Sequence, residues 1–507
     1  MPTYLLRVEG VNLRSVIWDT DDLSTRRGGG LMLLDAVTQL PEQLSALNLH
    51  PVATGASIGL FTFDADTPEA VDQVREAVEG HFQRGTFEYP DQSEGGTGHL
   101  PLKHGTFVVD VRELGETPIG QYEAVQDAIA ANHWRQMQQP SLSLDGLWNT
   151  GARDACILDW VRPGVMPSKK AERERELVSA SVSDRRRYGV GARQGFYDHE
   201  LDTRTNYAFT DSVQDLGTAD GPRPEAASET TDRKLAVFYA DGNKFGQKGM
   251  KRLRNEGLTA FGKWSDAIKA HHQKLLGELL ERADRGEGWK TSQGAIRLET
   301  LLWGGDEIIW VVPAWKGWEL AQWFLSQKHE ADGKPLSYGC GLVFCHLKAP
   351  IQNIVDLAQK IADRAKAAGG DANKSCLAYE VLESFDDVTG DLKRHRVKWL
   401  PKAEQERLLA PGNTDPDPLV LDAAHFCDAW AALREIAASD EFPLRQLYMR
   451  VHAWRKDDAA EVARTTERLN ECKVAGHLGN VVTELGADVG YLHLLQMLPY
   501  LPSEVTP

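Results

Sequence analysis

Residues 301–312 place the tightest constraint on the fold of this chain, because two apolar stretches flank Gly304, Gly305, Asp306 and Glu307. Leucine, isoleucine, valine and tryptophan are common in strands, and adjacent glycines allow the positive φ angles of a tight turn. The pattern predicts a β-hairpin that carries Asp306 and Glu307 at its tip.

A second predicted strand, residues 235–240, ends in Asp241. If the two strands are neighbours in one sheet, Asp241 and Asp306 converge, and like charges held that close favour a bound cation. Carboxylate and carbonyl oxygens suit Mg²⁺ or Mn²⁺, and Mg²⁺ is usually held by one or two carboxylates plus substrate phosphates. We therefore expect catalytic residues at Asp241, Asp306 and Glu307, with metal ligands among these acids and Gly242.

The residues after Asp241 form a glycine-containing loop before a predicted helix. Backbone amides of such a loop, together with the start of the helix, could cradle a triphosphate. Lys244 either reaches a phosphate or is a solvated loop lysine, and the pattern leaves both readings open. The expected nucleotide-binding positions are Gly242, Asn243, Lys244, Phe245, Gly246, Gly304 and Gly305.

The chain resembles the palm domain shared by GGDEF nucleotide cyclases and the large subunit of type III CRISPR effector complexes. The motifs that carry this resemblance occur in the family's order at residues 239–246, 304–307, 336–346 and 358–366. The resemblance implies that Asp241 and Asp306 bind metal and that Lys366 contacts phosphate. The CRISPR relatives usually have a second aspartate where this chain has Glu307, whereas the cyclases have glutamate. Whether Glu307 binds a second cation or stiffens the turn is left open.

The predicted fold class is α/β (α+β), with tandem ferredoxin-like palm domains of β-α-β-β-α-β order. The strand and helix patterns of residues 3–111 repeat the layout of residues 233–385, and the CRISPR relatives have the same tandem arrangement. The first copy has residues 54–59 where the hairpin acids would lie, so we expect it to be non-catalytic. The expected domains are an N-terminal palm-like domain at 1–115, an intervening domain or linker at 116–232, the catalytic palm at 233–395 and a helical domain at 396–507.

The formal net charge of −17 argues against a generally basic surface for nucleic acid, so any RNA contact needs a local patch. The candidates are Arg185, Arg186, Arg187 and Arg193, which either bind phosphate or serve domain packing. Six scattered cysteines without a Cys-x-x-Cys pair indicate reduced thiols. With no signal-peptide pattern and no apolar run near the ~20 residues of a membrane helix, we expect a cytoplasmic protein without a membrane partner.

Our leading hypothesis is a metal-dependent nucleotidyltransferase that makes a cyclic or linear oligonucleotide messenger from nucleoside triphosphates, with ATP favoured, in antiviral defence. The resemblance supplies the product class and the setting. It also implies RNA or CRISPR-type protein subunits as partners, and a homo-oligomer is a further option. The histidine-aspartate nuclease signature of many CRISPR large subunits is not found. The alternatives are an RNA-guided CRISPR large-subunit scaffold with regulated or weak cyclase activity, and a diguanylate cyclase.

Overall fold

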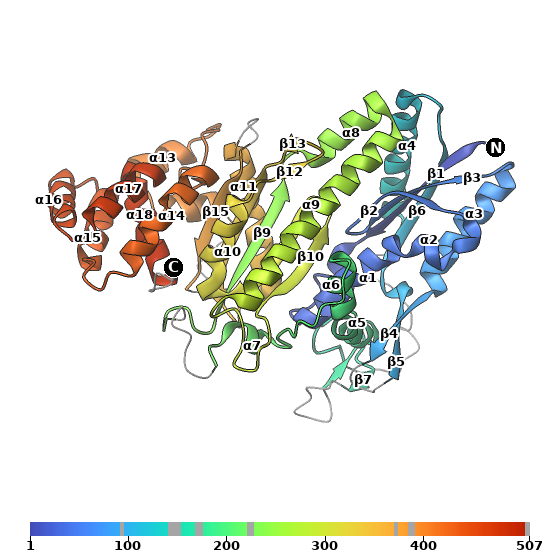
Figure 1. Cartoon of the computed structure of the whole chain (residues 1–507), viewed down its shortest axis with the longest axis horizontal. Helices are drawn as coiled ribbons and strands as arrows, with labels where there is room; N and C mark the ends of the chain where they lie inside the picture. The colour runs from blue at the N-terminus through green and yellow to red at the C-terminus, as the bar shows by residue number, and fades with distance from the viewer. Residues whose placement is uncertain are drawn as a thin grey trace.

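The computed structural model describes residues 1–91, 96–139, 154–167, 176–220, 228–369, 374–383 and 391–501. Figure 1 shows the N-terminal sheet at one end of the molecule, a larger sheet in the middle and a group of helices at the other end. The expected mixed α/β architecture with a helical C-terminal region is confirmed. None of the helices in the described ranges combines the length and apolar composition that spanning a bilayer requires.

The first sheet has four antiparallel strands in the order β2-β3-β1-β6. Its strands are β1 (Thr3–Val11), β2 (His50–Gly55), β3 (Ile58–Asp64) and β6 (Thr106–Glu113). The accompanying elements are α1 (Leu23–Thr38), α2 (Leu40–Gln43), α3 (Pro68–Arg84), β4 (Thr86–Asp91), β5 (Gly96–Pro101) and α4 (Pro118–Met137). Side chains alternate along β1, so Leu6 and Val8 pack under α1 and α3 while Leu5 packs under α4.

The second sheet has six strands in the order β10-β11-β9-β14-β15-β16, and only β14 and β15 run parallel. Its strands are β9 (Lys234–Gly242), β10 (Glu299–Gly304), β11 (Glu307–Pro313), β14 (Tyr338–His346), β15 (Cys376–Val381) and β16 (Leu421–Asp422). Its helices are α8 (Phe245–Glu256), α9 (Leu258–Arg285), α10 (Ala314–Ser326) and α11 (Ile351–Gly369), and a small ribbon of β12 (Glu330–Ala331) and β13 (Lys334–Pro335) precedes β14.

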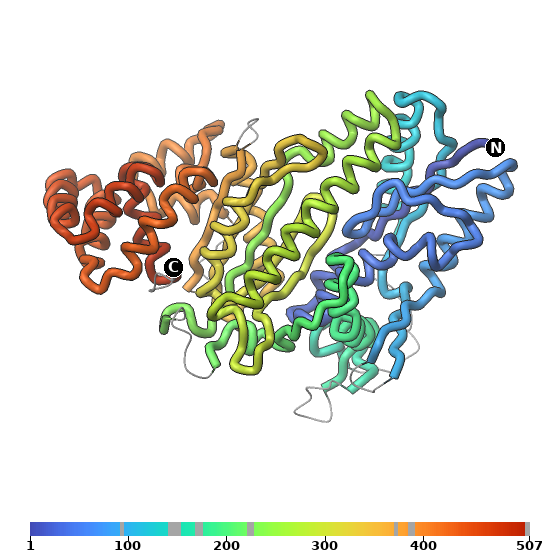
Figure 2. Tube along the Cα trace, in the orientation of Figure 1, coloured from blue at the N-terminus to red at the C-terminus, as the bar shows by residue number. Residues whose placement is uncertain are grey.

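Alternation along β9 determines which helices cover each face of the second sheet. Phe238 belongs to the core shared with α9 and α10, whereas Val237 and Tyr239 pack on the side of α11. Both sheets therefore follow the chain order β-α-β-β-α-β and then place one further helix, α4 or α11, on the opposite face. In the tube view the two units lie side by side along the chain's long axis (Figure 2).

The segment between the sheets contains β7 (Met166–Pro167), β8 (Leu177–Val178), α5 (Ala180–Gly191), α6 (Arg193–Glu200) and α7 (Val213–Gly217). Two of its candidate RNA-binding arginines are buried in packing contacts. The Arg185 guanidinium donates to Asp19 at 2.7 Å, and Arg193 donates to the Leu298 carbonyl at 2.8 Å. Arg185 thus ties α5 to the segment before α1, and Arg193 ties α6 to the residue before β10, which corrects the option that these two residues bind RNA.

The C-terminal helices are α12 (Leu392–Val397), α13 (Lys402–Leu409), α14 (Ala423–Ala437), α15 (Leu444–Arg455), α16 (Ala459–Asn470), α17 (Ala475–Leu485) and α18 (Ala487–Met497). Their apolar side chains join the core of the second sheet. Phe426 of α14 lies against Trp318 of α10, with ring centroids 5.9 Å apart. The helical region therefore packs directly on the larger sheet.

Candidate active site

The β10–β11 hairpin ends in a two-residue loop, as its glycines predict. Gly304 pairs with Glu307, which leaves Gly305 and Asp306 as the loop. Gly305 has a φ of 61° and Gly304 a φ of 143°, angles that residues with a β-carbon rarely adopt. A β-carbon at Gly304 would also lie 2.3 Å from the backbone nitrogen of Ala56 in the first unit. Gly304 is therefore needed to place Asp306, and Gly305 adopts its left-handed angle without strain.

The sheet register brings the predicted acids to one edge. Asp241 and Glu307 are direct partners across the antiparallel β9–β11 pair. The Gly242 amide donates a hydrogen bond of 2.9 Å to the carbonyl of Asp306. Asp241 thus lies beside Asp306 and Glu307, although 65 positions separate it from Asp306, at the edge where β9 ends and the hairpin turns.

Lys366 joins this group from α11. Helix α11 comes close to β14 at Gly339, where an added β-carbon would lie 2.3 Å from the Cγ of Lys366. The Lys366 ammonium forms an ion pair with the Asp241 carboxylate, and their side chains are 28% and 14% exposed. The structure therefore places the lysine implied by the resemblance directly beside the first acid.

The protonation equilibria of the acids are shifted by their surroundings. Burial raises the pKa of Asp241 to about 6; Lys366 opposes this shift, and the charges of Asp306 and Glu307 add to it. Burial also raises the pKa of Asp306 and of Glu307. Crowded, partly desolvated carboxylates of this kind are stabilised by added positive charge.

The oxygen-rich donor set fits Mg²⁺ or Mn²⁺. Over the described ranges, no three His, Cys, Asp or Glu side chains are arranged to hold a metal ion by themselves. Mg²⁺ is commonly held by one or two carboxylates, with substrate phosphates completing its shell. Asp241 and Asp306 suit that pattern.

Tyr239 and Ser337 are site residues that the sequence reasoning missed. The Tyr239 hydroxyl donates to Glu307 Oε1 at 2.5 Å, so Glu307 is held against β9. Strand alternation offered a signal, because Tyr239 lies two residues before Asp241 and so faces the same side. The Ser337 carbonyl accepts a hydrogen bond of 2.8 Å from the Asn243 amide, a contact for which the sequence held no signal.

The loop after Asp241 has the backbone of a tight connection into α8. Lys244 adopts a left-handed φ of 61° and immediately precedes the helix. The Asn243 side chain donates to Ser337 Oγ at 3.0 Å, so this amide braces the loop. Phe245 is buried against Tyr338, while a β-carbon at Gly246 would meet no atom within 4 Å. The start of α8 is therefore open at Gly246.

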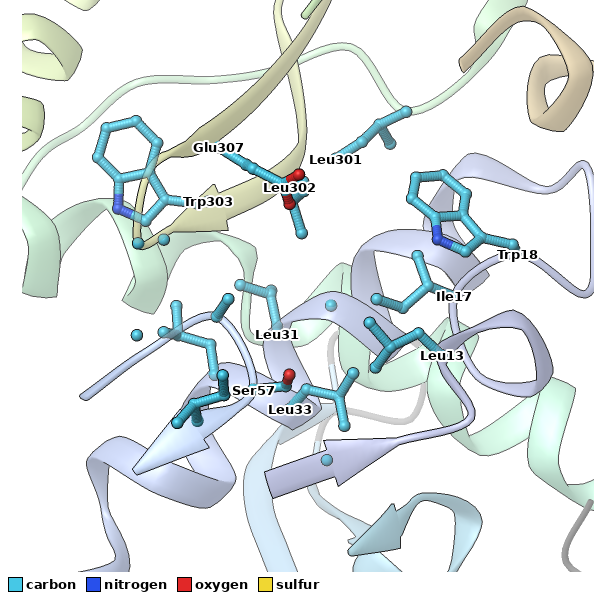
Figure 3. Close-up of a pocket in the computed structure, with 18 of the residues that line it drawn as sticks. Leu13, Ile17, Trp18, Leu31, Leu33, Ser57, Leu301, Leu302, Trp303 and Glu307 are labelled. Carbon is cyan, nitrogen blue, oxygen red and sulfur yellow. The ribbon is translucent and has the colours of Figure 1, made fainter. Parts of the chain in front are cut away.

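Two cavities meet at the hairpin tip. One, of about 850 Å³, lies between the loop after β1, helix α1 and the hairpin. The other, of about 330 Å³, lies between the hairpin, the start of α8 and the tip of the β2–β3 turn. Asp306 lines both cavities. Figure 3 shows the larger cavity with Ser57 and Glu307 on opposite walls.

No family model matches this chain, and no curated protein matches it in sequence. Solved structures do match. The Csm1 chain of a Csm1–Csm4 cassette in complex with cA4 aligns with a TM-score of 0.52 and 14% identity, over 98% of this chain and 69% of that chain. The same cassette in complex with AMPPNP aligns with a TM-score of 0.52 and 14% identity, over 98% of this chain and 70% of that chain. Csm1 in T. onnurineus aligns with a TM-score of 0.50 and 14% identity, also over 98% of this chain and 70% of that chain. The chain thus has the fold of Csm1, as its resemblance to type III CRISPR large subunits implied.

Proposed function

We propose that this protein is a metal-dependent nucleotidyltransferase that joins nucleoside triphosphates, with ATP favoured, into a cyclic or linear oligonucleotide messenger for antiviral defence. The observation that carries this proposal is the gathering of Asp241, Asp306 and Glu307 beside Lys366, with Asp306 lining two cavities. Solved Csm1–Csm4 cassettes hold AMPPNP or cA4, which favours ATP and a cyclic product for this fold.

The chemistry follows from the placement of the residues. A ribose hydroxyl of one nucleotide attacks the α-phosphorus of another, a P–O bond forms, the bond to pyrophosphate breaks and the hydroxyl proton passes to solvent. Mg²⁺ or Mn²⁺ held by Asp241 and Asp306 would supply charge neutralisation at the phosphates. Lys366 can release Asp241 to meet a triphosphate, and the open start of α8 at Gly246 offers backbone amides.

Two cavities at one hairpin suit a reaction between two nucleotides. Cavities of 300 to 1,000 Å³ are the usual size for small-molecule sites, and those of about 850 and 330 Å³ fall in this range. Positioning two substrates accounts for much of the catalysis in reactions of this class, so no dedicated base is required of the chain. In this proposal the second sheet unit is the catalytic palm, within the domain 233–395. The first is a partner palm, and α4 packs on it.

The test is mass spectrometry of the products after incubation with Mg²⁺ or Mn²⁺ and all four nucleoside triphosphates. We expect an oligonucleotide from the wild type and none from Asp306→Asn. Asp332→Asn is the matched control, because Asp332 also lies in the two-residue loop of a hairpin, and that hairpin forms a separate two-stranded sheet. Equal product from wild type and Asp306→Asn would refute the proposal.

A scaffold role in an RNA-guided complex is the second candidate, because the matching Csm1 chains were solved in cassettes with Csm4. Co-purification of RNA and small subunits, with no product from the isolated chain, would favour that role. A diguanylate cyclase, suggested by Glu307 and Lys366, would show GTP rather than ATP consumption in the same assay. A homo-oligomer that is active alone would argue against the scaffold.

A further inference from the structure

Helix α8 carries concentrated positive charge on a chain whose net charge is −17. Between Asp241 and Glu256 there is no acid, and there are five cations: Lys244, Lys248, Lys251, Arg252 and Arg254. At about 100° per residue, these five lie within one half of the helix circumference. Phe245, Gly249 and Leu253 lie on the other half and are buried.

The apolar side of α8 is covered by neighbouring helices. Leu253 shares a small core with Val125 and Ala128 of α4. Phe245 packs against Trp264 of α9, with ring centroids 6.3 Å apart. In Figure 1, α8 lies at the upper edge of the molecule beside α4 and α9. The cationic side of α8 therefore faces outward.

The spacing of the cations brings like charges next to one another. Lys248 has Lys244 and Arg252 four positions away, and Lys251 has Lys248 and Arg254 three positions away. Like charges at such spacings destabilise a helix. Partial burial lowers the pKa of Lys248, and the charge of Lys244 lowers it further. A bound anion would relieve this repulsion.

Other helices of the chain balance their cations with acids one turn away. Such pairs are Arg75 with Glu79 on α3, Lys274 with Glu278 on α9, and Arg464 with Glu461 on α16. On α8, Arg252 forms an ion pair with Asp332 of the β12–β13 loop. Lys248 donates to the Pro335 carbonyl at 3.4 Å, and no ion pair joins Lys248 or Lys251 to a described residue. Two lysines of this face are thus left without a counter-charge from the described part of the chain.

The composition of the face favours a nucleic acid over a protein partner. The cores of protein interfaces are enriched in aromatic residues and depleted of lysine. None of the large apolar side chains that are exposed in the described ranges lies on α8. The cations from Lys244 to Arg254 span about 15 Å at 1.5 Å per residue. That length suits a few phosphates of a single strand, whereas domains that bind duplex RNA cover about 16 base pairs.

We propose that the outward face of α8, formed by its five cations, binds the phosphate backbone of single-stranded RNA. It supplies the local basic patch that a chain of this net charge needs, a role from which burial excludes Arg185 and Arg193. No aromatic residue belongs to this face, so bases have no platform to stack on and binding should be independent of sequence. The inference goes beyond the proposed transferase and does not depend on it.

Fluorescence anisotropy with a labelled oligouridylate of about 12 nucleotides tests the surface, in EDTA and without nucleoside triphosphates. The dissociation constant is measured over a range of salt concentrations. Each phosphate contact on a single strand contributes about 0.7 to the slope of log Kd against log salt, so the double variant Lys248→Gln, Lys251→Gln should lower that slope by about 1.4. At about 0.1 M monovalent salt it should bind about 25-fold more weakly, because each contact contributes about fivefold. Its unfolding midpoint should be unchanged or raised, since like charges have been removed.

The double variant Lys402→Gln, Lys473→Gln is the matched control, because it makes the same change in net charge in the C-terminal helical region. These two side chains are 83% and 75% exposed, and they pair with Glu406 at 3.9 Å and with Glu441 at 2.7 Å. The control should bind the oligouridylate with the affinity and the salt slope of the wild type.

Three results would overturn the inference. The first is a wild type that does not bind the oligouridylate. The second is a salt slope that the α8 double variant leaves unchanged, or an equal loss in the control, which would mean that net charge alone explains binding. The third is tighter binding of polyglutamate than of the oligouridylate, compared per charge, which would assign the face to an acidic protein. None of these results bears on the transferase, which product analysis tests separately.

Discussion

Replacing Asp241 by asparagine should stabilise the protein while abolishing product formation. Asp241 is 14% exposed, and its neighbours include two further acids. Its pKa rises from 3.8 to about 6. At 1.36 kcal/mol per pKa unit, this shift of roughly 2 units means that ionising Asp241 costs the native state about 3 kcal/mol at neutral pH. Asparagine removes that cost. The gain has about 3 kcal/mol as its upper limit, because Lys366 loses its ionic partner.

The sign of the pH dependence follows from the direction of the shift. The native state binds the Asp241 proton more tightly than the unfolded state does, because the folded pKa is the higher one. The free energy of unfolding of the wild type therefore falls as pH rises from about 4 to about 6. Above about pH 6, the ionisation of Asp241 lowers it no further. The advantage of Asp241→Asn should be full at pH 7 and shrink toward pH 4.

The assay is thermal unfolding in EDTA at pH 7 and pH 5, with Asp332→Asn as control. A gain of 1 kcal/mol shifts the midpoint by about 2 to 4 °C for a cooperative unit of 150 to 250 residues, so we expect a rise of several degrees at pH 7. Adding Mg²⁺ in place of EDTA should raise the wild-type midpoint but not that of Asp241→Asn. If the unfolding midpoint of Asp241→Asn at pH 7 is unchanged or lowered, the argument that the ionised Asp241 carboxylate destabilises the native state is refuted.

Three further substitutions test the site. Gly304→Ala puts a β-carbon 2.3 Å from a facing backbone nitrogen, so it should lower the free energy of unfolding by about 1 to 3 kcal/mol. It should also lower the yield of product. Tyr239→Phe removes the donor to Glu307; we expect product formation to fall about tenfold with a small change in unfolding midpoint, and unchanged kinetics would contradict a positioning role. Lys366→Ala should raise the KM for nucleotide about tenfold or more and leave folding intact, and an unchanged KM would remove Lys366 from the phosphate site.

Local pattern was sufficient to predict the elements that carry the site. Adjacent glycines between apolar stretches predicted the hairpin at 301–312, and a short apolar run predicted the strand before Asp241; both are confirmed. Lys366 lies on the helix Ile351–Gly369. These features were readable because strand alternation, glycine turns and helical spacing depend on residues close together in the chain.

The sequence did not predict which distant side chains contact one another, because those contacts depend on how the strands pair. The bond between Tyr239 and Glu307 joins residues 68 positions apart, and the buried contacts of Arg185 and Arg193 join them to distant strands and loops. From the letters alone, a cluster of arginines is equally consistent with phosphate binding and with packing. Burial decided between these options, because an arginine held at 0% exposure by a carboxylate cannot also meet RNA.

The sequence by itself determined that Asp241 would follow a strand and that Asp306 would lie at the tip of a glycine hairpin. It also determined that the same order of elements would occur twice. Only the tertiary structure decided that the two hairpins meet tip to tip and that Asp306 borders two cavities. The physical reason is that local conformation follows from neighbouring residues, whereas the facing of two units follows from sheet register and close backbone contacts between segments far apart in the chain.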